Sequence, residues 1–298
     1  MVSSASLAGV WSMAEFFGEL KRWNMTIAID ASQEIAFPQD HLSGTTRTNV
    51  IDRWIYVFTA TSFIAIVLTG FVPDSIARIA GIRAGTLLPF PLAIHFHAVL
   101  MGSFLLLLLG QTVLVAMDKR NWHMQLGIAA AVLIPAVFVA TLIAVPTVYH
   151  GYWNAAQTAP APVREQIQGF LPILDDILLL QLREAVIFPV LMWVALRSRV
   201  RNPGLHKRLI FLASAPLLAA AFDRIHWLPT TMPSAAAGSD LYTLLAVSPL
   251  FIWDLVRNHG LHRAYLFFAV LYIPLTAVMY SVWDTPWWHA TARQIMGV

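Results

Sequence analysis

The stretch LAIHFHAVLMGSFLLLLLGQTVLVAMDKRN, residues 92–121, decides the fold class of this chain. Residues 92–117 contain no Asp, Glu, Lys or Arg, and about 20 apolar helical residues suffice to cross the ~30 Å core of a bilayer. The apolar residues are continuous rather than alternating, which favours a helix over a strand of a membrane barrel. We therefore expect residues 92–117 to form a transmembrane helix.

Six further stretches repeat this pattern. The chain of 298 residues is 58% hydrophobic and only 12% charged, whereas soluble domains average about 25% charged residues. The predicted spans are 50–72, 92–117, 125–148, 170–196, 209–228, 241–256 and 264–283. The sequence thus predicts an all-α, polytopic integral membrane protein with seven transmembrane helices in residues 50–284. Residues 1–49 form an N-terminal segment, and 285–298 a short outer C-terminal tail.

Basic residues are sorted between the loops. The loops after the second, fourth and sixth spans contain Lys119, Arg120, Arg197, Arg199, Arg201, Lys207, Arg208, Arg257 and Arg263, and the alternate loops contain Arg78, Arg83 and Arg164. Cytoplasmic loops are the positive ones, so we expect a bacterial inner membrane protein with a cytoplasmic N-terminus and a periplasmic C-terminus. Membrane lipids are the expected surroundings, and no nucleic-acid partner is expected. Because the chain has no cysteine, disulfides and thiolate metal ligands are excluded.

An Arg-Asn pair followed by His recurs in three of these loops, as RNWH (120–123), RNPGLH (201–206) and RNHGLH (257–262). The recurrence predicts one lone helix followed by three repeated hairpins. His123 and His206 then open outward-going helices near the cytoplasmic face. They are either cofactor ligands or interfacial residues that the topology requires in any case.

The N-terminal segment contains MAEFFGELKRW, residues 13–23, with apolar residues at helical spacing beside Lys21 and Arg22. This pattern is typical of an amphipathic helix that lies on the membrane surface. Residues 1–49 are therefore a candidate docking arm for partner membrane subunits, and the alternative is a tail with some local helix.

Charged groups inside spans mark the candidate site, because each costs about 2.5–3.5 kcal/mol on insertion scales. Helical rise places the candidates in the outer half of the bundle. They are His97, His150, Asp176, Arg183, Glu184, Asp223, Arg224 and His226. Asp223 and His226 are three residues apart and are expected to share a helix face.

Three chemistries can use these groups. In the first, His97 pairs with His150 or His226 as ligands of haem b, and Arg183 or Arg224 binds an anionic group. His123 and His206 are second-choice ligands.

In the second chemistry, His97, His150, His226, Asp223, Glu184 and Asp176 supply the ligands of Zn, Fe or Cu. In the third, the charges only form internal ion pairs. Arg183 then pairs with Asp176 or Asp223, and Arg224 pairs with Glu184.

Two segments carry a resemblance to a known group: HFHAVLMGSFLLLLLGQTVLVAMDKRNWHMQLG (95–127) and HKRLIFLASAPLLAAAFDRI (206–225). They resemble uncharacterised bacterial multi-span membrane proteins of the DUF2306-like family. The positions that carry the resemblance are His97, Gln111, His123, Gly127, 206–209 and Arg224. The chain is more distantly similar to cytochrome b561-like and haem A synthase-like bundles, and this similarity implies haem ligation by His residues on neighbouring helices.

These observations favour a membrane haem-binding or quinone-linked redox protein with a His/Arg/carboxylate site in the outer half of the bundle. One alternative is a non-enzymatic accessory subunit of a larger membrane complex. Another is a metal-dependent membrane enzyme that acts on a lipid-like substrate.

Overall fold

The computed structural model describes residues 40, 42 and 49–298. The predicted surface helix and docking arm in residues 1–49 lie outside the described residues, which include only Asp40, Leu42 and Asn49 of that segment. The described part is helical and contains no β-strand. Its elements are α2 (Val50–Arg83), α3 (Leu92–Ala116), α4 (Arg120–Thr158), α5 (Ala161–Ser198), α6 (Pro203–Ser214), the 3-10 turn η1 (Ala215–Leu218), α7 (Ala219–Phe222), α8 (Ala237–Asn258), α9 (Arg263–Val282) and α10 (Pro286–Met296).

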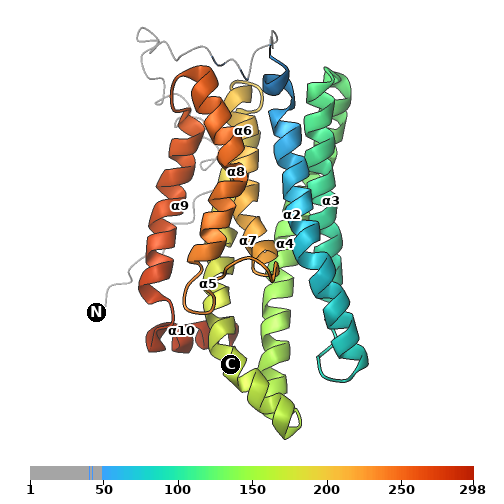
Figure 1. The fold of residues 1–298 in the computed structure, drawn as a ribbon, viewed down its shortest axis with the longest axis vertical. Helices are drawn as coiled ribbons and strands as arrows, with labels where there is room; N and C mark the ends of the chain where they lie inside the picture. Colours follow the sequence, from blue (N-terminus) through green and yellow to red (C-terminus); the bar gives the residue numbers. More distant parts are fainter. Residues whose placement is uncertain (1–39, 41, 43–48) are drawn as a thin grey trace, which may run out of the picture. The chain divides into compact units, whose positions relative to one another are not determined.

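Seven segments of the described residues are long and apolar enough to cross a membrane, when α6, η1 and α7 are counted as one span. The prediction of an all-α polytopic protein with seven spans is confirmed. The spanning helices run up and down, side by side, so their loops gather at two ends (Figure 1). We call the end with the loops 117–119, 199–202 and 259–262 the Arg208 end, and the opposite end, where α10 lies, the α10 end.

The centre of the bundle is the α6–α7 segment, whose span is 67% buried, the largest share among the seven. Helices α5 and α9 pack against α6, whereas α2 and α8 pack against η1 and α7. Helix α3 packs against α2 and α4 at one edge (Figure 1). The core consists of apolar side chains such as Phe63, Leu191, Leu209 and Leu218.

Helix starts at the Arg208 end explain part of the Arg-Asn-His recurrence. The Asn202 side chain accepts a hydrogen bond from the Leu205 N–H at 2.8 Å and caps α6. His262 Nδ1 accepts from the Ala264 N–H at 3.1 Å and caps α9. Burial lowers the pKa of His262 to about 4, and the charge of Arg208 acts in the same direction. The ring therefore stays neutral and able to accept this bond, which satisfies one N–H that a helix start leaves unpaired.

The predicted three-hairpin repeat holds for two pairs of helices. Helices α3 and α4 pack closely along each other, as do α5 and α6. Helix α8 instead packs mainly on α2, η1 and α7, and α9 packs on α5 and α6. These last two helices meet through side chains, such as the rings of Phe251 and Tyr265 at 4.9 Å between centroids. The third pair is spread around the central segment and is not a copy of the first two.

The fifth predicted span, 209–228, is wrong at its outer end. The helical segment stops at Phe222, and irregular backbone follows to residue 236. Pro229 and Pro233 lie in this stretch, and proline cannot continue a helical hydrogen-bond ladder. Asp223 and His226 are therefore loop residues and do not share a helix face.

Helices α4 and α5 extend beyond the membrane at the α10 end. They have 39 and 38 residues, which at helical rise gives about 58 and 57 Å, nearly twice the bilayer core. The predicted tail 285–298 is mostly the helix α10, which packs on α4 and α5 (Figure 1). Thr285 starts it, because its hydroxyl accepts a hydrogen bond from the Trp288 N–H and Pro286 follows at the first helical position, where its missing N–H costs nothing.

The crossing of α2 and α7 gives a first prediction. A Cβ added at Gly70 would lie 2.3 Å from the carbonyl oxygen of Ala221, so Gly70→Ala should lower the free energy of unfolding by about 1–3 kcal/mol. Unfolding in mixed micelles with a denaturing detergent measures this change. The control is Gly102→Ala on α3, where nothing lies within 4 Å of the added Cβ. Equal stability of the two variants would contradict the tight crossing.

Candidate functional site

Arg208 is the most completely paired charge at the Arg208 end. Its side chain is fully buried, and Asp254 accepts two hydrogen bonds from it, at 2.5 Å from Nε and 2.6 Å from Nη2. Asp40 accepts from Nη1 and Nη2 at 2.8 Å each. Asn258 also donates to Asp254 at 2.5 Å. This group ties α6, α8 and Asp40 together, and its many internal bonds indicate a structural role.

Arg183 forms a second buried network near the middle of α5. Its Nη2 and Nη1 donate to the two oxygens of Asp240 on α8, at 2.7 and 3.0 Å. The hydroxyls of Tyr272 and Tyr280 on α9 donate to the same carboxylate at 2.8 and 2.6 Å. Arg183 Nε donates to Glu184 at 3.0 Å. The network therefore joins three helices around one ion pair.

These contacts correct the predicted ion pairs. Arg183 pairs with Asp240 and Glu184, not with Asp176 or Asp223. Arg224 lies 3.5 Å from Asp74 on α2, not beside Glu184. Asp240 is absent from the predicted intramembrane groups because the predicted sixth span begins one residue after it. The partners of Arg183 and Arg224 were predicted wrongly for one shared reason, since ion pairing depends on which helices become neighbours.

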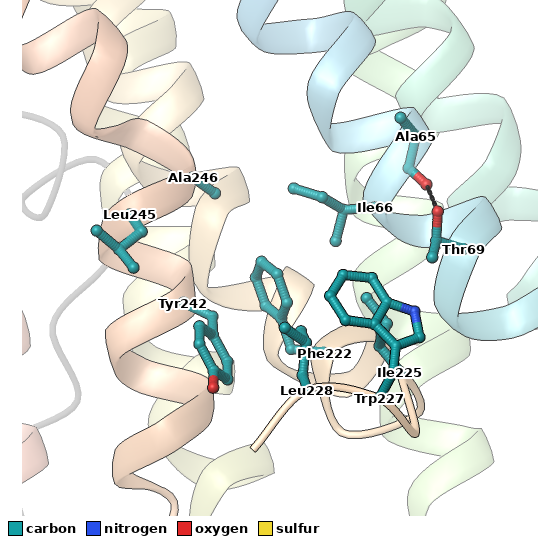
Figure 2. Close-up of a pocket in the computed structure, with 10 residues that line it drawn as sticks. All are labelled: Ala65, Ile66, Thr69, Phe222, Ile225, Trp227, Leu228, Tyr242, Leu245 and Ala246. Carbon is teal, nitrogen blue, oxygen red and sulfur yellow. Dashed lines mark hydrogen bonds between the residues drawn. The ribbon is translucent and has the colours of Figure 1, made fainter. Parts of the chain in front are cut away.

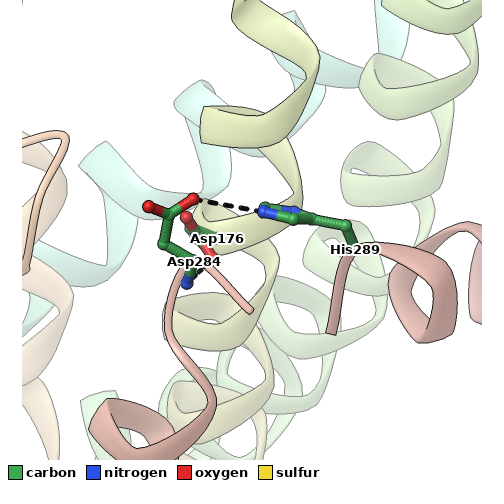
Figure 3. A group of neighbouring side chains, drawn as sticks. All are labelled: Asp176, Asp284 and His289. Carbon is green, nitrogen blue, oxygen red and sulfur yellow. Dashed lines mark hydrogen bonds and ion pairs between the residues drawn. The ribbon is translucent and has the colours of Figure 1, made fainter. Parts of the chain in front are cut away.

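The third polar group lies at the α10 end and joins Asp176, Asp284 and His289 (Figure 3). One ligand atom from each residue can be chosen so that all three lie within 4.8 Å of one another. Asp176 on α5 is buried, and its Oδ1 accepts a hydrogen bond from the Asp284 N–H at 3.0 Å. His289, in the first turn of α10, has Nε2 3.3 Å from Asp284 Oδ1. Asp284 itself has φ +52°, a left-handed conformation that is uncommon outside glycine and is often found at functional sites.

Asp175, the neighbour of Asp176 on α5, contacts His289 of this group. It is fully buried, and its Oδ1 accepts a hydrogen bond from the Tyr149 hydroxyl at 2.5 Å. Its Oδ2 lies 3.2 Å from His289 Nδ1 and 3.6 Å from Arg293. A carboxylate beside one ring nitrogen orients the imidazole so that the other nitrogen is presented, which is the usual arrangement around a metal-binding His. Here Nε2 is the presented nitrogen, and it faces Asp284.

Three buried polar atoms of this group, Asp175 Oδ2, His289 Nδ1 and Arg293 Nε, have no hydrogen bond among the described residues. The first two lie 3.2 Å apart and therefore face each other directly. The donor set fits a divalent cation, because two carboxylates and an imidazole suit Zn²⁺, Fe²⁺ or Mn²⁺.

The predicted histidine ligands of the outer half are not brought together. His97 Nδ1 lies 3.3 Å from the Thr141 hydroxyl of α4, whereas His150 Nε2 lies 2.6 Å from the Met296 carbonyl oxygen. Thr141 and His150 are nine residues apart on one helix, about 13 Å along its axis, so His97 and His150 are poorly placed to share an iron. His226 is exposed in the loop after α7.

The other predicted site residues have separate surroundings. Asp223 accepts a hydrogen bond from the Ser239 hydroxyl. Within the part of the chain that the structure describes, Glu184 Oε2 has no hydrogen-bond partner. His206 Nδ1 lies 2.8 Å from the Ala195 carbonyl oxygen, and His123 lies in the first turn of α4.

Sequence reasoning includes Asp176 among the candidates but misses Asp284 and His289. Both lie in WDTPWWH, residues 283–289, where the sequence pattern predicts only the end of the last span and a C-terminal tail. The available signal is Thr-Pro, a common N-cap and first-turn pair. It predicts a helix start at Thr285 but not the direction of that helix.

Comparisons with known proteins give no relative for this chain. No family model matches it, and no similar protein was found among the curated proteins or among the solved structures.

The Arg183 network gives the second prediction. Asp240→Asn should lower the free energy of unfolding by about 3 kcal/mol, because it leaves a buried arginine short of its counter-charge. Detergent unfolding of the purified protein measures the change. The matched control is Asp118→Asn, which breaks the pair with Arg53 where both side chains are largely exposed and should cost at most about 1 kcal/mol. A loss at Asp240 no larger than the loss at Asp118 would contradict a structural role for the network.

Proposed function

We propose that this protein binds a divalent cation at the α10 end, through Asp176, Asp284 and His289. The observation that carries the proposal is the convergence of two carboxylates and an imidazole that is oriented by a third carboxylate, Asp175. Asp175 acts as the positioning residue for His289. Helix α10 supplies the histidine and the loop before it supplies Asp284, so the site depends on the packing of α10 against α5.

Charge supports the same proposal. Asp175, Asp176 and Asp284 carry three negative charges, and Arg293 lies 3.6 Å from Asp175. While His289 is neutral, these four side chains and His289 have a formal charge of −2. Two of the carboxylates, Asp175 and Asp176, are buried, where uncompensated charge is costly, and a divalent cation would neutralise the group.

The chemical class that fits best is a metal-dependent membrane enzyme. Three protein ligands leave coordination positions free, and a cation held in this way activates water or polarises a phosphoryl or carbonyl oxygen. The Asp284 side chain is 73% exposed, so a substrate can reach the ligands from the aqueous side of the α10 end. Helix lengths place this end beyond the hydrocarbon core, which suits the polar part of a lipid-like substrate.

The haem or quinone-linked function remains a second proposal, with haem b as the expected cofactor. The observation that favours it is that His123 and His206 both lie in the first turns of their helices, α4 and α6, at the Arg208 end. Among the described residues, the buried Nδ1 of His123 has no hydrogen-bond partner. This pair differs from the predicted outer pair of His97 with His150 or His226.

Metal titration tests the leading proposal. Detergent-purified protein stripped with a chelator should bind Zn²⁺ or Mn²⁺ at one ion per chain in isothermal calorimetry. His289→Ala and Asp176→Asn remove ligands and should weaken binding at least about tenfold, and Asp175→Asn should weaken it by about tenfold through loss of orientation.

The control is the double variant Asp223→Asn with His226→Ala, an exposed carboxylate and imidazole at the same end, which should bind like the wild type. Binding that His289→Ala leaves unchanged would exclude this site. An absorption spectrum of the same preparation separates the two functions, because a Soret band would support haem.

We also propose that the Arg208 end is cytoplasmic, in a bacterial inner membrane, with the C-terminus periplasmic. The support is the gathering of Lys and Arg in the loops of that end, as the positive-inside rule requires.

Orientation is testable with single cysteines, because the chain has none of its own. In spheroplasts, a membrane-impermeant maleimide should label Val298→Cys at the α10 end directly. It should label Asn121→Cys at the Arg208 end only after the membrane is permeabilised. The reverse pattern would invert the topology.

A further inference from the structure

An apolar groove with a volume of about 360 Å³ opens between α2, α8 and the segment after α7 (Figure 2). Its lining residues are Ala65, Ile66, Thr69, Phe222, Ile225, Trp227, Leu228, Tyr242, Leu245 and Ala246. The Thr69 hydroxyl donates to the Ala65 carbonyl at 2.8 Å, and the Tyr242 hydroxyl donates to the Pro229 carbonyl at 2.7 Å. The polar groups of the lining are therefore bonded locally, and the groove offers a ligand mainly apolar contacts.

The groove lies within the depth of the hydrocarbon layer. Ala65 is 15 residues from the start of α2, about 23 Å along the helix, and Asp74 is about 36 Å along it. With a core of ~30 Å, the groove falls in the half near the α10 end, and Asp74 falls among headgroups. Trp227 is 75% exposed beside the groove, as is usual for tryptophans at a membrane interface.

A cation with spare donors lies directly beside this groove. Arg224 follows the lining residue Phe222 by two positions, and its side chain is 36% exposed. Its Nη1 donates to the Ala220 carbonyl oxygen, its Nε is 3.5 Å from Asp74 Oδ2, and its guanidinium stacks on Phe71 at 4.6 Å. Its Nη2 donates no hydrogen bond within the part of the chain that the structure describes.

A second cation lies close by. Arg78 is four residues beyond Asp74 on α2, and its positive charge acts on Arg224. The guanidinium of Arg78 packs over the Phe90 ring at 4.4 Å. Arginine guanidinium groups match the geometry of phosphate oxygens and bind them through paired hydrogen bonds.

We propose that the groove binds one acyl chain of an anionic glycerophospholipid, whose phosphate is held by Arg224 and Arg78. An apolar groove at acyl-chain depth, with two guanidinium groups at headgroup depth, matches the two halves of such a lipid. Asp74 competes with the phosphate for Arg224 and therefore limits the affinity. This site is separate from the proposed metal site, and neither needs the other.

Native mass spectrometry tests the lipid site. The full chain, purified in a nonionic detergent, is titrated with dioleoylphosphatidylglycerol or with dioleoylphosphatidylcholine. We expect one phosphatidylglycerol retained per chain. Each of Arg224→Gln and Arg78→Gln should weaken that retention about fivefold, the usual effect of one basic residue on an anionic lipid. Asp74→Asn should strengthen it, because the competing carboxylate is removed.

Two further variants make the test decisive. Ala65→Phe, at an exposed position on the groove wall, should weaken retention of both lipids because it fills the groove. Arg83→Gln is the control, since Arg83 is an exposed arginine on the same helix, about 8 Å beyond Arg78 along its axis. Equal retention by Arg224→Gln, Arg78→Gln and Arg83→Gln would overturn the headgroup assignment, and unchanged retention by Ala65→Phe would overturn the groove.

Discussion

A charge buried in a helical bundle has to be paired, and two buried arginines meet this requirement by joining helices that are distant in sequence. Arg208 binds Asp254 and Asp40, and Arg183 binds Asp240 and Glu184. Placing a single charge in the middle of a span costs about 2.5–3.5 kcal/mol on insertion scales, and the cost falls when a counter-charge and hydrogen bonds are provided. The positions of α5, α6, α8 and α9 therefore depend on both pairs.

The ion pairs contribute more to the association of helices here than they would in a soluble protein of the same size. In lipid, apolar side chains gain little by leaving the membrane for a helix interface, so helix association relies on close packing and on polar contacts. The chain uses both means. Gly70 lets α2 approach the backbone of α7, while the hydroxyls of Tyr272 and Tyr280 add hydrogen bonds to the Arg183–Asp240 pair. Together these contacts hold the helices to one another from inside the bundle, and the surface that faces the lipid is apolar.

The spans could be predicted from the sequence because the bilayer acts on each helix separately, through length and composition. The partners of charged residues could not, since Arg183 and Asp240 are 57 residues apart and meet only after several helices have packed. Helix α10 was missed for another reason. It is short and amphipathic, and its tryptophans read equally well as an interfacial belt. Its His289 and the preceding Asp284 could not be placed without knowing that α10 folds back onto α5.

The two ends of the bundle differ in how completely their charges are matched, and this difference is the reason for proposing a cation at the α10 end. At the Arg208 end the carboxylates of Asp40 and Asp254 surround one guanidinium and accept four hydrogen bonds from it. At the α10 end the three carboxylates of Asp175, Asp176 and Asp284 lie near one arginine, Arg293, which is 3.6 Å from Asp175. A group whose charges and hydrogen bonds are matched internally gains little free energy by binding an ion. An anionic group with an oriented imidazole gains free energy when it binds a cation. A cation bound there as proposed would therefore also stabilise the packing of α10 on α5.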